Sequence, residues 1–295
     1  MTLIEGGTLT SVAGIRVGHW TDTEARTGCT VVVLPEPNVV AGETRGAAPG
    51  SRETALLEPG MAVEQAQAIV LSGGSAFGLA AADGVMDELE KDGRGHPTPA
   101  GVVPIVPAAV VFDLMIGDAS VRPGSEHGAA AYLAANGGPV EQGLLGAGAG
   151  ATVSKWRGEA NAVGIGSAAV RTGAATIGAL VVVNALGDVF SLEGESLTGG
   201  AHEPGPLAIG PPIGQNTTLV VVATDARLTR AELTRLAVRG QDALAACLRP
   251  AHTRFDGDTC FAISCGGHEV LVDLVAEGAF ESVGRALEAA VAAAG

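Results

Sequence analysis

Aromatic residues are scarce in this sequence of 295 residues. Tryptophan, tyrosine and phenylalanine together make up 3% of the chain, so its hydrophobic core cannot be built around large rings. Apolar residues nevertheless reach 47%, and together with 44 glycines they predict a core of alanine, valine and leucine in which backbone segments approach closely. No linker, repeat or charge block divides the sequence, which favours a single domain over residues 1–295.

Cysteine is also rare, and its positions exclude two kinds of scaffold. Cys29, Cys247, Cys260 and Cys265 are too few and too irregularly spaced for a disulfide framework or for a zinc site of paired Cys-x-x-Cys motifs. We expect them to be small buried side chains. The six histidines form no His-x-x-x-His pair and lie near no cluster of acidic residues, so we expect neither a metal nor another cofactor.

Basic residues number only 17 against 32 acidic ones, which gives a formal net charge of −15. Because phosphate contacts need clustered lysine and arginine, we expect no nucleic-acid partner. The sequence also lacks an apolar run of membrane-spanning length, and its first residues lack the basic start and apolar stretch of a signal peptide. These absences predict a cytoplasmic protein that does not bind a membrane.

The apolar pattern predicts strands and helices in loose alternation. Runs rich in β-branched residues predict strands over residues 30–34, 68–71, 179–184 and 219–223. Helical spacing predicts helices over residues 77–91, 128–135, 229–248 and 280–294. Thr229 and Glu232 form a capping box, and a glycine- and proline-rich loop over residues 198–214 is long enough for a lid or an oligomer arm. The fold class is therefore α/β or α+β.

Two glycine-rich segments match ligand-binding motifs only loosely. Residues 72–75 precede a predicted helix, where free backbone N–H groups suit an anion or a carbonyl oxygen, and an N-cap by Ser75 is the alternative. Gly146-x-Gly148-x-x-Ala151 fits part of a dinucleotide fingerprint. No strand clearly precedes it, however, and Arg171 stands where an acidic ribose ligand is needed, so we expect no dinucleotide.

The segment RFDGDTCFAISCGG, residues 254–267, joins an acidic loop to a predicted strand, and Thr259 stands at the junction. If the bond between Asp258 and Thr259 were cut, Thr259 would carry both a hydroxyl nucleophile and a free α-amine to act as its base. Gly257 would supply backbone freedom for such a strained turn. The alternative is an ordinary turn before a buried strand. The thiol of Cys260 is a competing nucleophile, although a core position is favoured for it.

This segment resembles the cleavage-site segment of the self-processing aminopeptidases, which include L-aminopeptidase/D-esterases, β-peptidyl aminopeptidases and nylon-oligomer (6-aminohexanoate) hydrolases. Six other segments resemble blocks of that family, in the family's order, at residues 14–19, 45–54, 71–79, 104–109, 146–156 and 181–185. Six blocks in order are far more specific than any one of them. The resemblance implies a four-layer αββα sandwich similar to the N-terminal-nucleophile hydrolases, which periodicity alone does not show.

The resemblance also implies roles for individual residues. The chain would cut itself between Asp258 and Thr259, into fragments 1–258 and 259–295, and Thr259 would then be the nucleophile. Lys155 falls where the family places a lysine beside the nucleophile, and its ammonium would stabilise negative charge and lower the pKa of the Thr259 amine. Lys91 and Lys155 are the only lysines of the chain, and without the resemblance each is more often a solvated surface residue.

Other site residues follow from the resemblance with open alternatives. Asn184 would be an oxyanion donor, whereas its position after a valine run also fits a turn-forming asparagine. Phe112 stands where several characterised relatives have a tyrosine near the oxyanion. Because a phenyl ring cannot donate a hydrogen bond, either the oxyanion site is poorer here or it selects the substrate by shape. A shift of the alignment by one residue is the third alternative. Glu281 and Ser282 are the nearest candidates for an acidic partner of the nucleophile, with helix capping as the alternative.

The expected function is therefore hydrolysis of a small peptide or amide through an acyl-enzyme on Thr259. One alternative is an acyltransferase of the ornithine acetyltransferase type, in which an amine replaces water as acyl acceptor. Another is an unprocessed relative that only binds or scaffolds. The resemblance further implies a homo-oligomer, often a tetramer of processed units.

Overall fold

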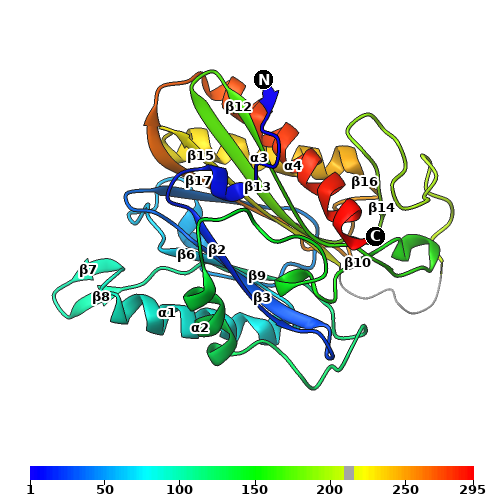
Figure 1. Cartoon of the computed structure of the whole chain (residues 1–295), viewed down its shortest axis with the longest axis horizontal. Coiled ribbons are helices and arrows are strands. Elements are labelled where there is room, and N and C mark those ends of the chain that lie inside the picture. Colours follow the sequence, from blue (N-terminus) through cyan, green and yellow to red (C-terminus); the bar gives the residue numbers. More distant parts are fainter. Residues whose placement is uncertain (209–215) are drawn as a thin grey trace.

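The computed structural model describes residues 1–208 and 216–295, and shows two β-sheets stacked between two pairs of helices (Figure 1). Part of the loop predicted over residues 198–214 therefore lies outside the described residues. None of the described helices is both long and apolar enough to cross a membrane.

The larger sheet has six strands in the order β1-β12-β13-β15-β17-β4. Its strands are β1 (Thr2–Leu3), β4 (Val39–Thr44), β12 (Gly164–Thr172), β13 (Ala175–Asn184), β15 (Thr217–Ala226) and β17 (Thr259–His268). Neighbouring strands run antiparallel, except that β15 and β17 run parallel. The segment that carries Thr259 thus enters the interior of this sheet, between β15 and β4.

The second sheet has five strands in the order β2-β3-β6-β9-β5. Its strands are β2 (Arg16–Asp22), β3 (Thr27–Val33), β5 (Ser51–Arg52), β6 (Ala68–Ser72) and β9 (Ala108–Val110). In the described part of the chain, three two-stranded pairs lie outside the main sheets: β7 (His96–Thr98) with β8 (Gly101–Val103), β10 (Thr152–Val153) with β11 (Asn161–Ala162), and β14 (Asp188–Val189) with β16 (Leu248–Arg249). Short 3₁₀ helices cover Leu9–Ser11, Thr54–Leu57, Ser75–Ala80, Gly146–Gly148 and Lys155–Arg157.

The four α-helices found in residues 1–208 and 216–295 cover the outer faces of the two sheets. Helices α3 (Arg230–Cys247) and α4 (Val272–Ala294) pack on the larger sheet, whereas α1 (Ala81–Lys91) and α2 (Ser125–Ala134) lie against the second sheet (Figure 1). Strand β13 shows the layering, because Val181 and Val183 face the helices while Leu180 and Val182 face the second sheet. A third buried cluster joins the second sheet to α1 and α2. The predicted four-layer αββα sandwich is therefore confirmed.

Burial on both faces explains why the central strands are almost continuously apolar. Every residue of β13 is buried, and such strands show valine-rich runs instead of alternation. Each predicted strand and helix is present. The predicted capping box is confirmed, because the side chain of Thr229 accepts a hydrogen bond from the backbone N–H of Glu232.

Three helix starts differ from the prediction, and α2 begins at Ser125, three residues before the predicted start at residue 128. The helix predicted from residue 77 opens as the 3₁₀ segment Ser75–Ala80, with Gly74 and not Ser75 as its N-cap and with no side-chain capping bond. The last helix begins at Val272, eight residues before the predicted start at residue 280. Gly278 lowers the helical propensity there, but its lack of a side chain is what lets α4 pack on Ile177, because a Cβ would lie 2.9 Å from Cδ1.

Candidate active site

Thr259 is the first residue of β17, where the loop after β16 enters the larger sheet. Its sheet neighbours are Thr44 of β4 and Leu219 of β15. The residue is 1% exposed, and its Oγ1 donates to the carbonyl oxygen of Gly257 at 3.0 Å and lies 3.5 Å from Oγ1 of Thr44. The hydroxyl is therefore turned toward the residues that precede it in the chain.

The turn before Thr259 packs tightly against the loop that follows β4. The carbonyl oxygen of Asp256 accepts from the N–H of Ala48 at 3.0 Å, and the N–H of Gly257 donates to the carbonyl oxygen of Asn216 at 2.9 Å. A Cβ on Gly257 would lie 2.4 Å from the carbonyl oxygen of Ala48. Glycine is thus needed at this position for space, whereas its φ lies outside the left-handed region in which the backbone freedom of glycine would matter.

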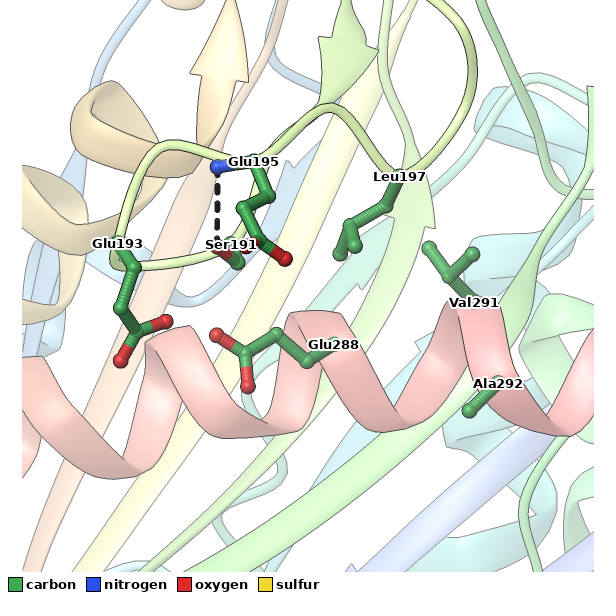
Figure 2. Close-up of a pocket in the computed structure, with 7 residues that line it drawn as sticks. All are labelled: Ser191, Glu193, Glu195, Leu197, Glu288, Val291 and Ala292. Atoms are coloured by element: carbon green, nitrogen blue, oxygen red, sulfur yellow. Dashed lines mark hydrogen bonds between the residues drawn. The ribbon is translucent and has the colours of Figure 1, made fainter.

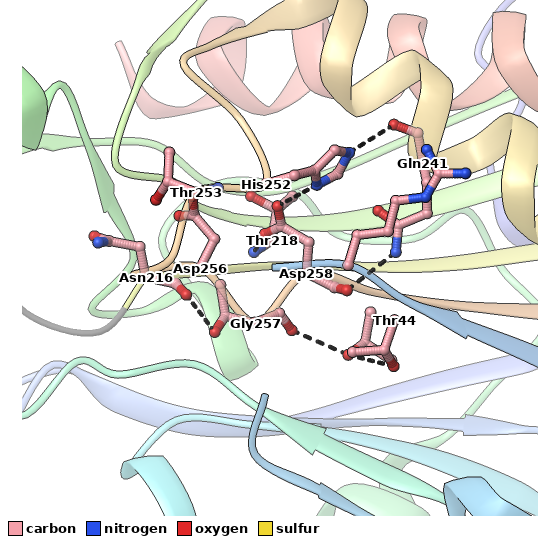
Figure 3. A network of polar contacts seen from close by, with 12 residues as sticks. Thr44, Asn216, Thr218, Gln241, His252, Thr253, Asp256, Gly257 and Asp258 are labelled. Atoms are coloured by element: carbon pink, nitrogen blue, oxygen red, sulfur yellow. Dashed lines mark hydrogen bonds and ion pairs between the residues drawn. The ribbon is translucent and has the colours of Figure 1, made fainter. Parts of the chain in front are cut away.

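The side chain of Asp258 is held by two partners (Figure 3). Its Oδ1 accepts from the N–H of Thr218 at 2.6 Å, and its Oδ2 lies 2.8 Å from Nδ1 of His252. The Nε2 of His252 is 3.1 Å from the carbonyl oxygen of Gln241, so both ring nitrogens are occupied. Burial lowers the pKa of His252, but the Asp258 carboxylate outweighs it and the pKa is raised. His252 therefore serves Asp258 and does not face Thr259.

Lys155 is buried together with Asn184. Lys155 is 4% exposed, and its Nζ donates to Oδ1 of Asn184 at 2.7 Å. The same Oδ1 accepts from the N–H of Thr152 at 3.2 Å, and Nδ2 of Asn184 donates to the carbonyl oxygen of Phe112 at 3.2 Å. This burial rules out the solvated surface position that a lone lysine would ordinarily take.

Burial changes the protonation of two groups in this region. It lowers the pKa of Lys155 from 10.5 to about 7, although the nearby carboxylate of Asp256 acts in the opposite direction. It also raises the pKa of Asp256 to about 6, and the negative charge of Asp258 adds to that rise. Near neutral pH Lys155 therefore exists partly as the neutral amine and partly as the ammonium, whereas the sequence predicts the ammonium.

Lys155 and Asn184 reach the neighbourhood of Thr259 through β15. Asn184 pairs with Thr217 of that strand, and Thr259 pairs with Leu219, two residues further along it. No hydrogen bond within the described part of the chain joins Lys155 or Asn184 directly to Thr259. The three predicted catalytic residues thus lie at one end of the larger sheet, in two neighbouring groups.

Two cavities open at this end of the sheet. The larger, of about 410 Å³, is lined by Gly42, Glu43, Thr44, Pro49, Ser51, Thr54, Ala55, Glu58 and Thr259. The smaller, of about 170 Å³, is lined by Ala48, Pro49, Gly50, Ser75, Ala76, Val110, Phe112 and Thr217. Pro49 borders both, so the predicted nucleophile Thr259 and Phe112 line adjoining spaces.

Glu281 and Ser282 lie on α4 and contact other partners. Glu281 binds Arg285 at 2.9 Å, and Oγ of Ser282 donates to the carbonyl oxygen of Ala279 at 3.1 Å. A separate cavity of about 490 Å³ beside α4 is lined by Ser191, Glu193, Glu195, Leu197, Glu288, Val291 and Ala292 (Figure 2). Two of its acidic residues, Glu193 and Glu288, also pair with Arg285, so these carboxylates neutralise an arginine on α4.

Sequence reasoning missed Gln241 and His252 as neighbours of the Asp258–Thr259 bond. Gln241 is fully buried on α3, where it continues the apolar stripe of Leu233, Ala237 and Leu244. A polar residue on such a stripe is a signal that could have been found. No hydrophobic or motif pattern marks the contact of His252 with Asp258, six residues further along the chain. No group of His, Cys, Asp and Glu side chains within the described ranges could hold a metal ion.

Comparison with known proteins agrees with this architecture. The sequence profile of peptidase family S58 matches residues 7–294. An uncharacterized aminopeptidase of Mycobacterium leprae is 44% identical over 295 residues, covering 88% of this chain and 79% of the relative. The 6-aminohexanoate-oligomer endohydrolase of Paenarthrobacter ureafaciens is 31% identical over 268 residues, covering 85% of this chain and 73% of the relative.

A solved structure extends the comparison to the fold. The L-aminopeptidase D-Ala-esterase/amidase of Ochrobactrum anthropi, described as a variant of the Ntn hydrolase fold, superposes with a TM-score of 0.75 at 22% identity. The match covers 98% of this chain and 86% of that one. The predicted similarity of the fold to that of N-terminal-nucleophile hydrolases is confirmed. The chain therefore belongs to peptidase family S58 and is a hydrolase of peptide or amide bonds.

Proposed function

We propose that the chain cuts its own Asp258–Thr259 bond and then hydrolyses small peptides or amides through an acyl-enzyme on Thr259. The observation that carries the proposal is the position of Thr259 at the start of β17, with its hydroxyl turned back on the preceding backbone and the residue on the wall of the 410 Å³ cavity. Cleavage would leave a hydroxyl and an α-amine on one residue facing that space.

Lys155 and Asn184 complete the proposed site. The amide nitrogen of Asn184 carries two N–H groups; Phe112 accepts from this nitrogen, and the second N–H is suited to an oxyanion. With a pKa of about 7, Lys155 can exchange a proton at neutral pH and, when charged, can stabilise negative charge. Phe112 would contribute an apolar wall and no hydrogen bond.

The names of the relatives support an amide substrate, because one is an aminopeptidase and another acts on 6-aminohexanoate oligomers. We therefore propose a small peptide or oligoamide as substrate, without a cofactor. We also propose that processed units assemble into a homo-oligomer, which light scattering of the processed protein would test.

Intact mass spectrometry of the purified protein tests the proposal first. We expect two fragments, residues 1–258 and 259–295, with Thr259 at the N-terminus of the smaller one. A chain that stays whole after prolonged incubation would contradict self-cleavage. The processed protein should then release free amino acids from a panel of amino-acid amides and 6-aminohexanoate oligomers, whereas transfer of the acyl group to an added amine in place of water would indicate an acyltransferase.

A further inference from the structure

The carbonyl oxygen of Asp258, which belongs to the bond proposed to be cut, accepts two hydrogen bonds. The backbone N–H of Arg45 donates to it at 2.8 Å, and Nε2 of Gln241 donates at 3.0 Å. Both distances are those of ordinary hydrogen bonds to a carbonyl oxygen, and an oxyanion formed by attack on Asp258 would develop on this same atom. The bond from Arg45 continues the pairing of β4 with β17, but no strand pairing requires the bond from Gln241.

Gln241 reaches this oxygen from α3 in an orientation that leaves its own side-chain oxygen without a hydrogen bond within the described residues. Its Nε2 donates to two carbonyl oxygens, those of Glu43 at 2.9 Å and Asp258, so the orientation of the amide is fixed. Its Oε1 is buried and has no hydrogen-bond partner within the described residues. An unpaired buried acceptor lowers stability, so an apolar side chain would suit this helix better if packing were the only demand.

Asp258 is also fixed through its side chain. The N–H of Thr218 and the ring of His252 hold its two carboxylate oxygens, and the ring of His252 is anchored in turn on the carbonyl oxygen of Gln241 (Figure 3). The side chain and the carbonyl group of Asp258 are therefore both held before any reaction. Preorganised donors of this kind stabilise charge that develops during a reaction.

We infer that Gln241 and the backbone N–H of Arg45 form the oxyanion hole of the self-cleavage reaction, an inference that rests on the proposed function. Oγ of Thr259 bonds to the carbonyl carbon of Asp258, and the carbonyl oxygen takes up the negative charge between these two donors. The bond from that carbon to the nitrogen of Thr259 then breaks, and the nitrogen receives the proton lost by Oγ. Water opens the resulting ester, which leaves a carboxylate on Asp258 and a hydroxyl and an amine on Thr259.

This role separates self-cleavage from turnover. Gln241 contacts the carbonyl oxygen of the chain's own residue 258, whereas Asn184 is the donor proposed for the substrate. A variant of Gln241 should therefore affect the appearance of the two fragments more than the activity of chains that have already been cut.

The test follows fragment formation during cell-free synthesis by mass spectrometry, in wild type, Gln241→Leu, Gln241→Glu and the control Gln67→Leu. Gln67, which immediately precedes β6, is also a buried glutamine, and its Oε1 accepts from the N–H of Ile105 at 2.9 Å. We expect Gln241→Leu to be cut at least about 100-fold more slowly than wild type, and Gln67→Leu to be cut at the wild-type rate.

The pH dependence of cleavage in Gln241→Glu distinguishes an oxyanion donor from a residue with a purely structural role. An ionised carboxylate beside the carbonyl oxygen repels the oxyanion, whereas a protonated one donates to it. The cleavage rate of this variant relative to wild type should therefore rise as the pH is lowered from about 8 to about 5, across the titration of a glutamic acid whose pKa is raised by burial. If Gln241→Leu fails to fold, as judged by circular dichroism, the pH profile of Gln241→Glu decides whether Gln241 stabilises the oxyanion.

Three outcomes would overturn the inference. Cutting of a folded Gln241→Leu chain at a rate within about threefold of wild type removes the assignment of Gln241 and leaves the proposed function intact. A cleavage rate of Gln241→Glu that does not change with pH relative to wild type also removes the assignment of Gln241 and leaves the proposed function intact. A wild-type chain that is never cut overturns the proposed function itself, and the inference with it.

Discussion

The amine of Lys155 lies 2.7 Å from Oδ1 of Asn184, and both side chains are buried. The N–H of Thr152 donates to the same Oδ1, so the amide is oriented with Nδ2 toward the carbonyl oxygen of Phe112. This contact, with that of Thr152, therefore sets the direction in which Asn184 donates. Burial of the same lysine lowers its pKa to about 7.

Replacement of Lys155 by methionine should change how stability depends on pH. The folded chain, with a pKa of about 7, binds fewer protons than the unfolded chain, with the ordinary value of 10.5, so this lysine makes stability rise with pH between those values. Lys155→Met should remove that rise. Urea unfolding at several pH values, in an uncut Thr259→Ala background, measures it.

Lys155→Met should also reduce turnover at least about tenfold or prevent processing, because the group proposed to exchange a proton is lost. Lys91→Met is the matched control, since Lys91 is the other lysine of the chain and its side chain is 67% exposed. The control should keep wild-type kinetics. Normal kinetics in Lys155→Met would remove the lysine from the mechanism and leave it a packing role.

Asn184→Asp separates the donor of Asn184 from its acceptor. The substitution keeps an oxygen for Lys155 and Thr152 but deletes the N–H groups proposed to bind the oxyanion. We expect turnover of the processed protein to fall about 100-fold to 1000-fold, with a smaller change in KM. A fall in kcat/KM that comes only from a raised KM would instead indicate a role in binding the substrate before the reaction.

Sequence reasoning predicts some features of this protein more readily than others. The valine-rich runs of β13 and β15 and the capping box at Thr229 depend on local pattern, so their positions are predicted correctly. The contact of Gln241 with Asp258 depends instead on how α3 lies across the end of β17. Periodicity shows that such a helix exists but not which strand end it reaches.

The loop before β17 shows the same limit. His252 and Asp258 are six residues apart, and their contact requires the loop to turn back, with His252 at a φ of +53°. A left-handed backbone at a histidine is not predictable from hydrophobic pattern. The pKa of Lys155 likewise follows from burial, which composition does not report.

The choice between Thr259 and Cys260 as nucleophile has a simple test. Cys260 is fully buried in the core cluster beneath α3 and α4, and burial, reinforced by the charge of Glu43, raises the pKa of its thiol far above the ordinary range. Thr259→Ala should therefore stay whole and inactive, Thr259→Ser should still be cut, and Cys260→Ala should be cut and active. N-terminal sequencing of the small fragment checks the outcome. A fragment that starts at residue 260 would assign the nucleophile to the thiol.

The last prediction concerns the base that activates Thr259. The two ring nitrogens of His252 contact the Asp258 carboxylate and the carbonyl oxygen of Gln241, so neither nitrogen is free to accept a proton from Thr259. The Asp258 carboxylate also raises the pKa of His252 against the effect of burial. Stability from this pair should be full below the ordinary histidine pKa of 6.5 and be lost as the pH rises through the raised folded value. His252→Gln in the uncut Thr259→Ala chain should remove that loss.

Kinetics of the processed His252→Gln protein complete the test. If the free amine of Thr259 is the base, the rate should rise with pH along a limb governed by a group near or below the ordinary α-amino value of about 7.7 to 8.0, and His252→Gln should keep both that limb and most of the rate. His268→Gln, at an exposed end of β17, is the control and should behave in the same way. Loss of this limb in His252→Gln alone would identify a Thr-His site, because the limb requires a base that titrates in that pH range. Self-cleavage at Asp258–Thr259 would then serve to open the cavity and not to create the base.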